Sequence, residues 1–341
     1  MFSFLYSSSS SNESESKIQR HFNNVIQSGD QLPNGKDIDF LTLCTNNNDT
    51  IIYLIQIVHN CLRHNNANEK IIIKCLFLIH QFSRNGNIDF LKEFQHYLHI
   101  FISNDYSNLN SKLPLYYNKY LLSKFLVYKE LQISLEREPI KAIRKEFISS
   151  LSYSDLCISI VLLQSQFQNL TDMMTELCKE GSYYPITHAL VLYAQEGLII
   201  FSILSFQLLQ ALNGFDVIND IKQLSILLNC VHLYSKQAIH FNTYGSYLST
   251  NKYLTNPWPD VQPLDKDFEE LLEEHIKQLQ QIEDKEQKEK QEKEHQKYKE
   301  NKKQSVSNHS SSSLLMIYFN DIPINLFNNI ISPTANKIKI E

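Results

Sequence analysis

Apolar residues that recur every three or four positions constrain the fold of this chain more than any other feature. The clearest run consists of Ile160, Leu163, Phe167, Leu170, Met174 and Leu177. This spacing places the side chains on one face of an α-helix. A second run starts at Val217 and continues to about Tyr244. No stretch shows the strict alternation of a half-buried strand. The chain is therefore predicted to be all-α, as in helix bundles and solenoids.

The composition agrees with long helices, since only 7 Gly and 9 Pro occur among 341 residues. The chain is 43% hydrophobic and 20% charged, so most of it should fold, as one large domain or two ordinary ones. Capping residues and apolar patterns predict further helices. They are expected at Thr50–Leu62, Lys70–Phe82, Ile88–Ile102, Leu115–Leu135, Ile186–Leu212 and Lys266–Ile282.

The composition changes along the chain and predicts four parts. Residues 1–16 become rich in Ser, Asn and Glu and are expected to be flexible. Residues 17–282 form the helical domain. Residues 283–303 carry almost no apolar side chains but many charged pairs spaced by four, which predicts a solvated, projecting helix. Residues 304–341 form a mostly disordered tail with a small apolar island at Leu314–Phe327.

Charge and cysteine usage narrow the class of protein. The net charge of −5 argues against a general nucleic-acid binder, whose affinity rests on clustered Lys and Arg. The six cysteines lie far apart in apolar stretches, without a Cys-x-x-Cys pair. Reduced, buried thiols are therefore expected, which points to the cytosol.

Two apolar stretches raise the question of a membrane. The N-terminus lacks the basic region of a signal peptide, and its apolar stretch is too short for one. Phe2, Phe4, Leu5 and Tyr6 could insert into a membrane interface, although the following Ser run favours a disordered tail. Gly197–Leu212 is uncharged but shorter than the ~20 residues of a membrane span. A central helix of a bundle accounts for it better.

Signatures of catalysis do not appear in the sequence. It contains no Gly-rich phosphate loop, nucleophile elbow or kinase motif. His96 and His99 lie three residues apart, but no cysteine or carboxylate stands at metal-ligand spacing around them. The chain is predicted to be a non-enzyme, and no cofactor or metal is expected.

Four motifs occur in the order in which one known family carries them. Ile71–Asn87 is an apolar run with Lys74 and His80, closed by Gly-Asn. Tyr117–Tyr128 follows the pattern Tyr-x-x-Tyr-Leu-x-x-Lys-x-x-x-Tyr, Asp39–Asn46 ends in Cys-Thr-Asn, and Leu271–Ile276 reads Leu-Leu-Glu-Glu-His-Ile. Through these motifs, residues 17–282 resemble the ANTH domain of the clathrin assembly protein (phosphatidylinositol-binding clathrin adaptor) family.

The resemblance implies a fold and a function. The fold would be a superhelical stack of long antiparallel helices. The function would be that of a peripheral membrane adaptor that binds phosphoinositides such as phosphatidylinositol-4,5-bisphosphate and takes part in clathrin coat assembly. Its partners would be clathrin heavy chain, SNARE proteins bound along the C-terminal helix, and adaptor complexes. It would act in the cytoplasm at plasma-membrane coated pits, coated vesicles or the Golgi. The alternative is a soluble helical scaffold that kept the fold and lost lipid binding.

The family's lipid site is a Lys-rich motif ending Pro-Lys-x-Lys-His before the Cys-Thr-Asn helix. Here Pro33 and Lys36 match, while Asn34 and Asp37 replace a lysine and the histidine. An upstream Lys-Ala-Thr element is Asn24–Ile26 here. Other cations on the preceding helix are spaced by three and four and could supply the missing charge, or could be plain surface residues. The candidate lipid-binding residues are therefore Lys36, Arg20, Lys17 and His21.

Motifs for coat proteins are sparse. Leu314, Leu315 and Ile317 have the spacing of the start of a clathrin box, although Tyr318 stands where the family has an acidic residue. Asn256–Trp258 resembles an Asn-Pro-Phe ligand with a different aromatic ring, or is a connector that packs on the domain. Clathrin binding is thus expected from the resemblance more than from these residues.

Overall fold

The computed structural model describes residues 5–29, 33–64, 68–103, 106–180, 184–251 and 257–305. Within these ranges the regular structure is helical, with no strand, which confirms the all-α class. In chain order the helices are α1 (Leu5–Ile26), α2 (Gly35–Leu43), η1 (Cys44–Asn46), α3 (Asn48–His64), α4 (Glu69–Asn85), α5 (Ile88–Phe94), η2 (Gln95–Tyr97), α6 (His99–Ser103), α7 (Leu113–Leu131), α8 (Pro139–Ile143), α9 (Lys145–Ser150), α10 (Tyr153–Glu180), α11 (Tyr184–Leu212), η3 (Phe215–Val217), α12 (Ile221–Thr250) and α13 (Lys266–Ser305).

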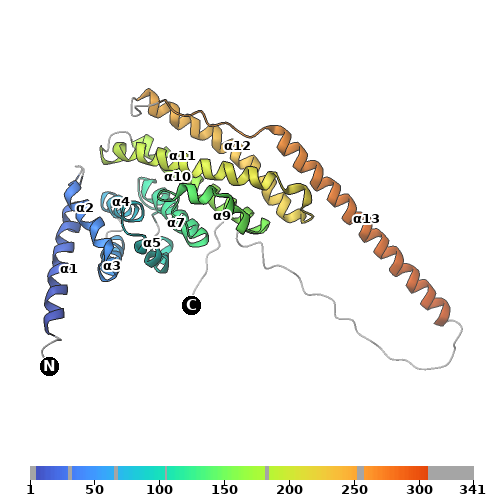
Figure 1. Ribbon diagram of the computed structural model, residues 1–341, viewed down its shortest axis with the longest axis horizontal. Helices are drawn as coiled ribbons and strands as arrows, with labels where there is room; N and C mark the ends of the chain where they lie inside the picture. The colour runs from blue at the N-terminus through green and yellow to red at the C-terminus, as the bar shows by residue number, and fades with distance from the viewer. Residues whose placement is uncertain are drawn as a thin grey trace. The chain divides into compact units, whose positions relative to one another are not determined.

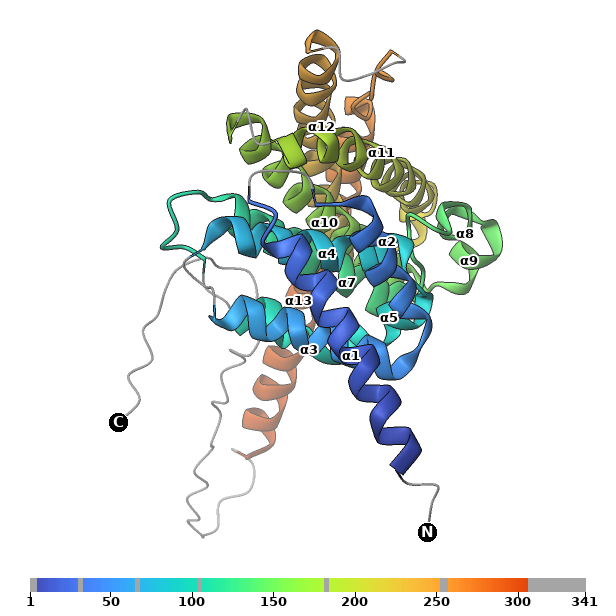
Figure 2. The same ribbon diagram turned by 90° about the vertical axis from the view of Figure 1, so that its left-hand side faces the viewer.

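The chain divides into two compact units, residues 1–282 and 283–341. In the first unit, α10, α11 and α12 lie side by side (Figure 1). Helix α7 packs against α10 on one side and against α4 on the other, so it joins the long helices to the N-terminal ones. Helix α1 lies against α2, α3 and α4 at the N-terminal end of this stack (Figure 2).

Local sequence signals set many helix starts. Asn68 accepts a hydrogen bond from the main-chain N–H of Ile71 (3.3 Å) and so caps α4. Asn87 caps α5 in the same way through Asp89. Because the first N–H groups of a helix have no partner within it, such side chains define where a helix begins.

The periodic apolar run lies on the buried face of α10. Ile160, Leu163, Phe167 and Met174 are each fully buried. Helix α11 is apolar on more sides, and its segment Leu190–Leu212 is long and apolar enough to cross a membrane by length and composition. In this unit α11 packs against α8, α10 and α12, as expected for a central helix.

Two of the predicted helices differ from those in the structure. The predicted helix Ile88–Ile102 is interrupted by the 3-10 turn η2. Asn118 on α7 donates a hydrogen bond to the main-chain oxygen of Phe101 (2.8 Å) and so ties α6 to α7. The predicted helix Leu115–Leu135 ends at Leu131, because Gln132 adopts a left-handed φ of 53° and breaks the helical path.

The N-terminus also differs from the prediction. Residues 1–16 were expected to be flexible, but α1 begins at Leu5. Ile18, Phe22 and Val25 are fully buried and anchor the helix. Serine lowers helix stability only modestly, so an anchored helix can extend through the Ser run. The four-part division of the chain otherwise stays a prediction.

Candidate functional site

The junction of α1 and α2 brings the predicted lipid-binding residues together. His21 on α1 lies with its Nδ1 2.5 Å from the Asp37 Oδ1 on α2. Asn24, one turn later, donates to the same oxygen at 3.3 Å. The Lys17 ammonium lies 5.1 Å from the centre of the Phe40 ring, a cation–π distance. One edge of α1 therefore packs along α2.

Three cations at this junction are exposed to solvent: Lys17 and Arg20 on α1, and Lys36 in the first turn of α2. Lys36 directly precedes Asp37, which contacts α1, so its backbone lies beside that helix. The Asn34 side chain accepts the main-chain N–H of Lys36 (3.1 Å) and sets the start of α2. We call Lys17, Arg20 and Lys36 the junction cations.

His21 plays a different part from the junction cations. Its side chain is only 18% exposed and contacts both the Asp37 carboxylate and the Phe40 ring. Asp37 is itself buried. Asp37 therefore holds His21 in place and brings negative charge to the junction, so His21 contributes to packing between α1 and α2.

Lys74 belongs to the structure rather than to a charged surface. It is almost fully buried on α4, and its Nζ donates to the Ser28 Oγ (2.8 Å) and to the main-chain oxygen of Gly29 (2.7 Å). These groups follow the C-terminal end of α1, where carbonyl groups lack partners and a positive charge is favoured. Lys74 thus caps α1 from a neighbouring helix.

The remaining predicted residues lie elsewhere. Leu314, Leu315 and Ile317 fall outside the described residues. The His99 ring contacts His59 on α3 edge to face, with ring centres 5.6 Å apart. In the described part of the chain, no group of three or more His, Cys, Asp or Glu side chains is placed to hold a metal ion.

Sequence reasoning missed a buried polar cluster at the centre of the first unit. Glu196, on the apolar helix α11, is fully buried. Its carboxylate contacts the His80 Nε2 (2.9 Å) and the Arg84 guanidinium (2.9 Å) on α4. The Tyr120 hydroxyl on α7 donates to the same carboxylate at 2.5 Å. The only sequence signal was an acidic residue within an otherwise apolar helix.

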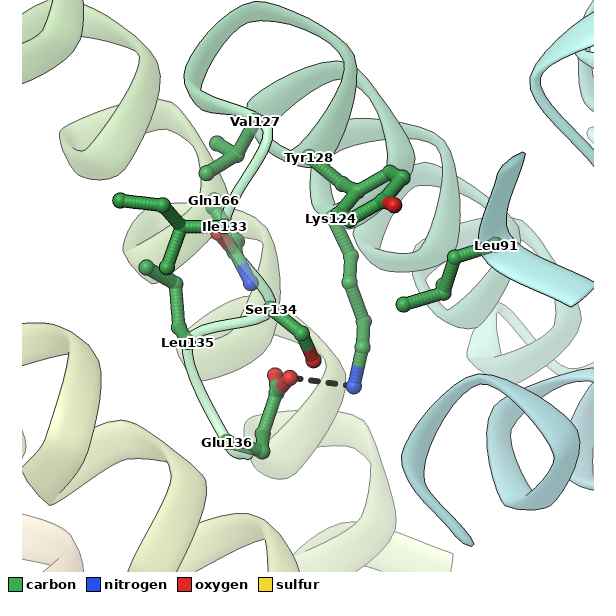
Figure 3. A pocket seen from close by; sticks show the side chains of 9 residues that line it. All are labelled: Leu91, Lys124, Val127, Tyr128, Ile133, Ser134, Leu135, Glu136 and Gln166. Carbon is green, nitrogen blue, oxygen red and sulfur yellow. Dashed lines mark ion pairs between the residues drawn. The ribbon is translucent and has the colours of Figure 1, made fainter. Parts of the chain in front are cut away.

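The cluster continues into a second buried ion pair (Figure 3). The Lys124 Nζ lies 2.9 Å from the Glu136 Oε1 and 3.8 Å from the Glu196 Oε2. Glu136 belongs to the connection after α7, and Ser134 and Gln166 line the same small cavity. Side chains from α4, α7 and α11 therefore converge on one set of charges. We call Glu196, His80, Arg84, Lys124 and Glu136 the buried cluster.

The surroundings of the buried cluster favour a fixed charge state. Burial alone would raise the pKa of the Glu196 carboxyl. The charges of His80 and Lys124 and the hydrogen bonds from His80 and Tyr120 outweigh this effect of burial. The pKa of Glu196 therefore lies well below its usual range. Burial lowers the pKa of His80, with Glu196 acting in the opposite direction. Since the Glu196, His80 and Lys124 side chains are buried and only Arg84 is partly exposed, the arrangement suits contacts between the helices rather than ligand binding.

The fold and the α1–α2 junction together define an all-helical stack that carries three exposed cations on the two helices of this junction. Residues 13–110 match the family model of the ENTH domain. This segment contains α2 to α6, with Lys36, and the part of α1 that carries Lys17 and Arg20. No curated protein matches the chain significantly.

ENTH and ANTH domains are related, and ENTH domains form a family of non-enzymatic adaptors. The match therefore supports a domain of the broader class that includes ENTH and ANTH domains, over about the N-terminal third of the chain. The assignment to ANTH in particular stays a prediction.

Proposed function

We propose that this protein is a peripheral membrane-trafficking adaptor that binds acidic phosphoinositides through Lys17, Arg20 and Lys36. The observation that carries the proposal is the position of these three exposed cations at one helix junction, inside the segment that matches the ENTH domain. ENTH domains are associated with phosphoinositide membranes.

The expected affinity of the protein for phosphoinositide membranes is modest. Each basic side chain near an anionic membrane contributes ~1 kcal/mol, so three contribute about 3 kcal/mol. The net charge of −5 opposes approach to the same surface. Binding should therefore depend on highly charged phosphoinositides and fall with salt, because exposed charges are screened.

The finer role follows from the resemblance to clathrin adaptors. We propose clathrin heavy chain as a partner of the tail through Leu314, Leu315 and Ile317, and SNARE proteins or adaptor complexes as further partners. Coated pits and coated vesicles would be the sites of action. These assignments depend on the ANTH relationship more than on particular contacts.

A vesicle sedimentation experiment tests the lipid site. The full chain is mixed with phosphatidylcholine vesicles that contain or lack phosphatidylinositol-4,5-bisphosphate. Each of Lys36→Glu and Arg20→Glu replaces attraction with repulsion, a change of about 2 kcal/mol, so affinity for the phosphoinositide vesicles should fall roughly 30-fold. Lys236→Glu, an exposed lysine on α12, is the matched control and should bind like the unaltered protein. Equal binding by all three variants would sink the assignment.

A specific observation favours the alternative, a soluble helical scaffold without lipid binding. Of the cations near this end of the stack, Lys74 caps α1 and His21 pairs with Asp37. Both are held by the fold, which leaves fewer charges for a headgroup. Failure of the unaltered protein to sediment with either kind of vesicle would select this alternative.

A further inference from the structure

The edge of α1 opposite α2 borders an open groove. Lys17, His21 and Asn24 face α2, whereas Gln19, Asn23 and Ile26 lie roughly half a turn away around the helix. Between this second edge and α3 the surface is hollowed by about 370 Å³. The groove therefore lies on the opposite side of α1 from Lys17 and from the junction with α2.

The groove has an apolar floor and two rims of carboxamides. Phe22, Ile57 and Cys61 are buried and form the floor. On the rims, Gln19 and Asn23 come from α1, while Gln56 and Asn60 come from α3. Among the residues that the structure describes, no Lys, Arg, Asp or Glu lines the groove.

The carboxamides are placed to hydrogen bond with a ligand. Gln56 and Asn60 are exposed. The Gln19 amino group donates to the Asn23 Oδ1 (3.0 Å), which leaves the Gln19 carbonyl and the Asn23 amino group with bonding capacity. A carboxamide offers both a donor and an acceptor, as a peptide bond does.

The spacing of the amides matches an extended chain. Within each rim the two residues are four apart, which is about 6 Å along a helix. An extended peptide repeats every two residues, or about 6.6 Å. From Tyr53 to His64 the α3 side of the groove runs roughly 16 Å, the length of about five extended residues.

The lining also argues against other occupants. An inositol phosphate needs several cations, and the described lining of the groove contains no Lys or Arg and a single His, His64. A partner helix has its main-chain groups already bonded internally, so it would leave the amide rims unused.

We propose that the groove between α1 and α3 binds an extended, uncharged peptide segment of about five residues from a partner protein. The two amide rims hold its main chain, and alternate apolar side chains point to the floor. This inference does not depend on the membrane function proposed above.

NMR spectroscopy of the ¹⁵N-labelled full chain tests it directly, because side-chain NH₂ signals of Asn and Gln are observable. The probe is the blocked pentapeptide Ac-Thr-Val-Asn-Val-Thr-NH₂ at millimolar concentration. We expect shifts of the NH₂ signals of Gln19, Asn23, Gln56 and Asn60. The same peptide with both valine nitrogens methylated loses two main-chain donors, so it should bind roughly 30-fold more weakly at ~1 kcal/mol per bond.

The double variant Gln56→Leu/Asn60→Leu removes one rim and should weaken the unmethylated peptide to a similar extent. Asn229→Leu, an exposed amide on α12, is the control and should leave binding unchanged. The proposal is overturned if the groove signals do not move, if the methylated peptide binds equally well, or if inositol trisphosphate rather than the peptide shifts them. If the double variant does not fold, the methylated peptide on the unaltered protein still decides.

Discussion

Cationic side chains meet carboxylates in two regions of this protein, and burial gives the two regions different roles. At the α1–α2 junction the cations Lys17, Arg20 and Lys36 are exposed, and only His21 is held by Asp37. In the buried cluster, His80 and Lys124 surround Glu196 without contact with solvent. Exposed charges remain able to bind a membrane, whereas buried ones must be paired at all times.

Breaking the buried cluster should have the largest effect. Glu196→Gln removes the buried carboxylate charge that His80, Arg84 and Lys124 share, and leaves Lys124 with Glu136 alone as its counter-ion. We expect a loss of about 3–5 kcal/mol in the free energy of unfolding, measured by urea denaturation. Glu273→Gln, whose partner Lys277 is exposed one turn away, is the control and should change it by less than about 1 kcal/mol. Similar losses in both variants would contradict the comparison.

Lys74 tests whether a cation near the junction is structural. Lys74→Met keeps the length of the side chain but removes the donor to the Gly29 and Ser28 oxygens. The free energy of unfolding should fall by about 1–3 kcal/mol. Measured where the variant is fully folded, its affinity for phosphoinositide vesicles should not change. Lower vesicle affinity with unchanged stability would place Lys74 on the membrane surface instead.

The buried cluster should also make stability depend on pH. Because burial lowers the pKa of His80 in the folded protein, the unfolded chain binds a proton more readily below its ordinary pKa of 6.5. Stability should therefore fall as pH decreases below about 6.5, by at most ~1.4 kcal/mol per pH unit for this residue. His59, whose pKa is lowered by burial and by His99, acts in the same direction.

Glu196 extends this loss to lower pH. Its folded-state pKa is held low, so its contribution is present above the ordinary value near 4.5 and is lost as pH falls further. Urea midpoints between pH 7.5 and about 2.5 follow both steps. Stability that rises on acidification would refute this account of the cluster.

The smallest effect on stability is expected at the junction. Lys36→Met changes an exposed residue. Its main-chain N–H donates to the Asn34 side chain, and the substitution leaves this bond in place. The free energy of unfolding should stay within about 0.5 kcal/mol of the unaltered protein. Vesicle affinity should fall roughly fivefold, because one cation contributes ~1 kcal/mol. A clear loss of stability would show that Lys36, like Lys74, supports the fold.

Much of the helical fold could be predicted because its signals are local. The spacing of Ile160, Leu163 and Phe167 reports one buried face, and Asn68 and Asn87 mark helix starts. Lys17 and Arg20 were proposed from their spacing along one helix and Lys36 from its match to a family motif, and their lipid-binding role stays a prediction. The role of His21 in packing could not be predicted, because its partner Asp37 lies on another helix.

The sequence by itself therefore determined the all-α class and most helix positions, since periodicity and capping act within a few residues. Only the tertiary structure decided which charges are exposed. Lys36 and Lys74 look alike in the sequence, yet one faces solvent and the other caps α1. Glu196 meets His80 across 116 residues of chain. The physical reason is that the environment of a charge depends on every helix packed around it, and local sequence does not specify those neighbours.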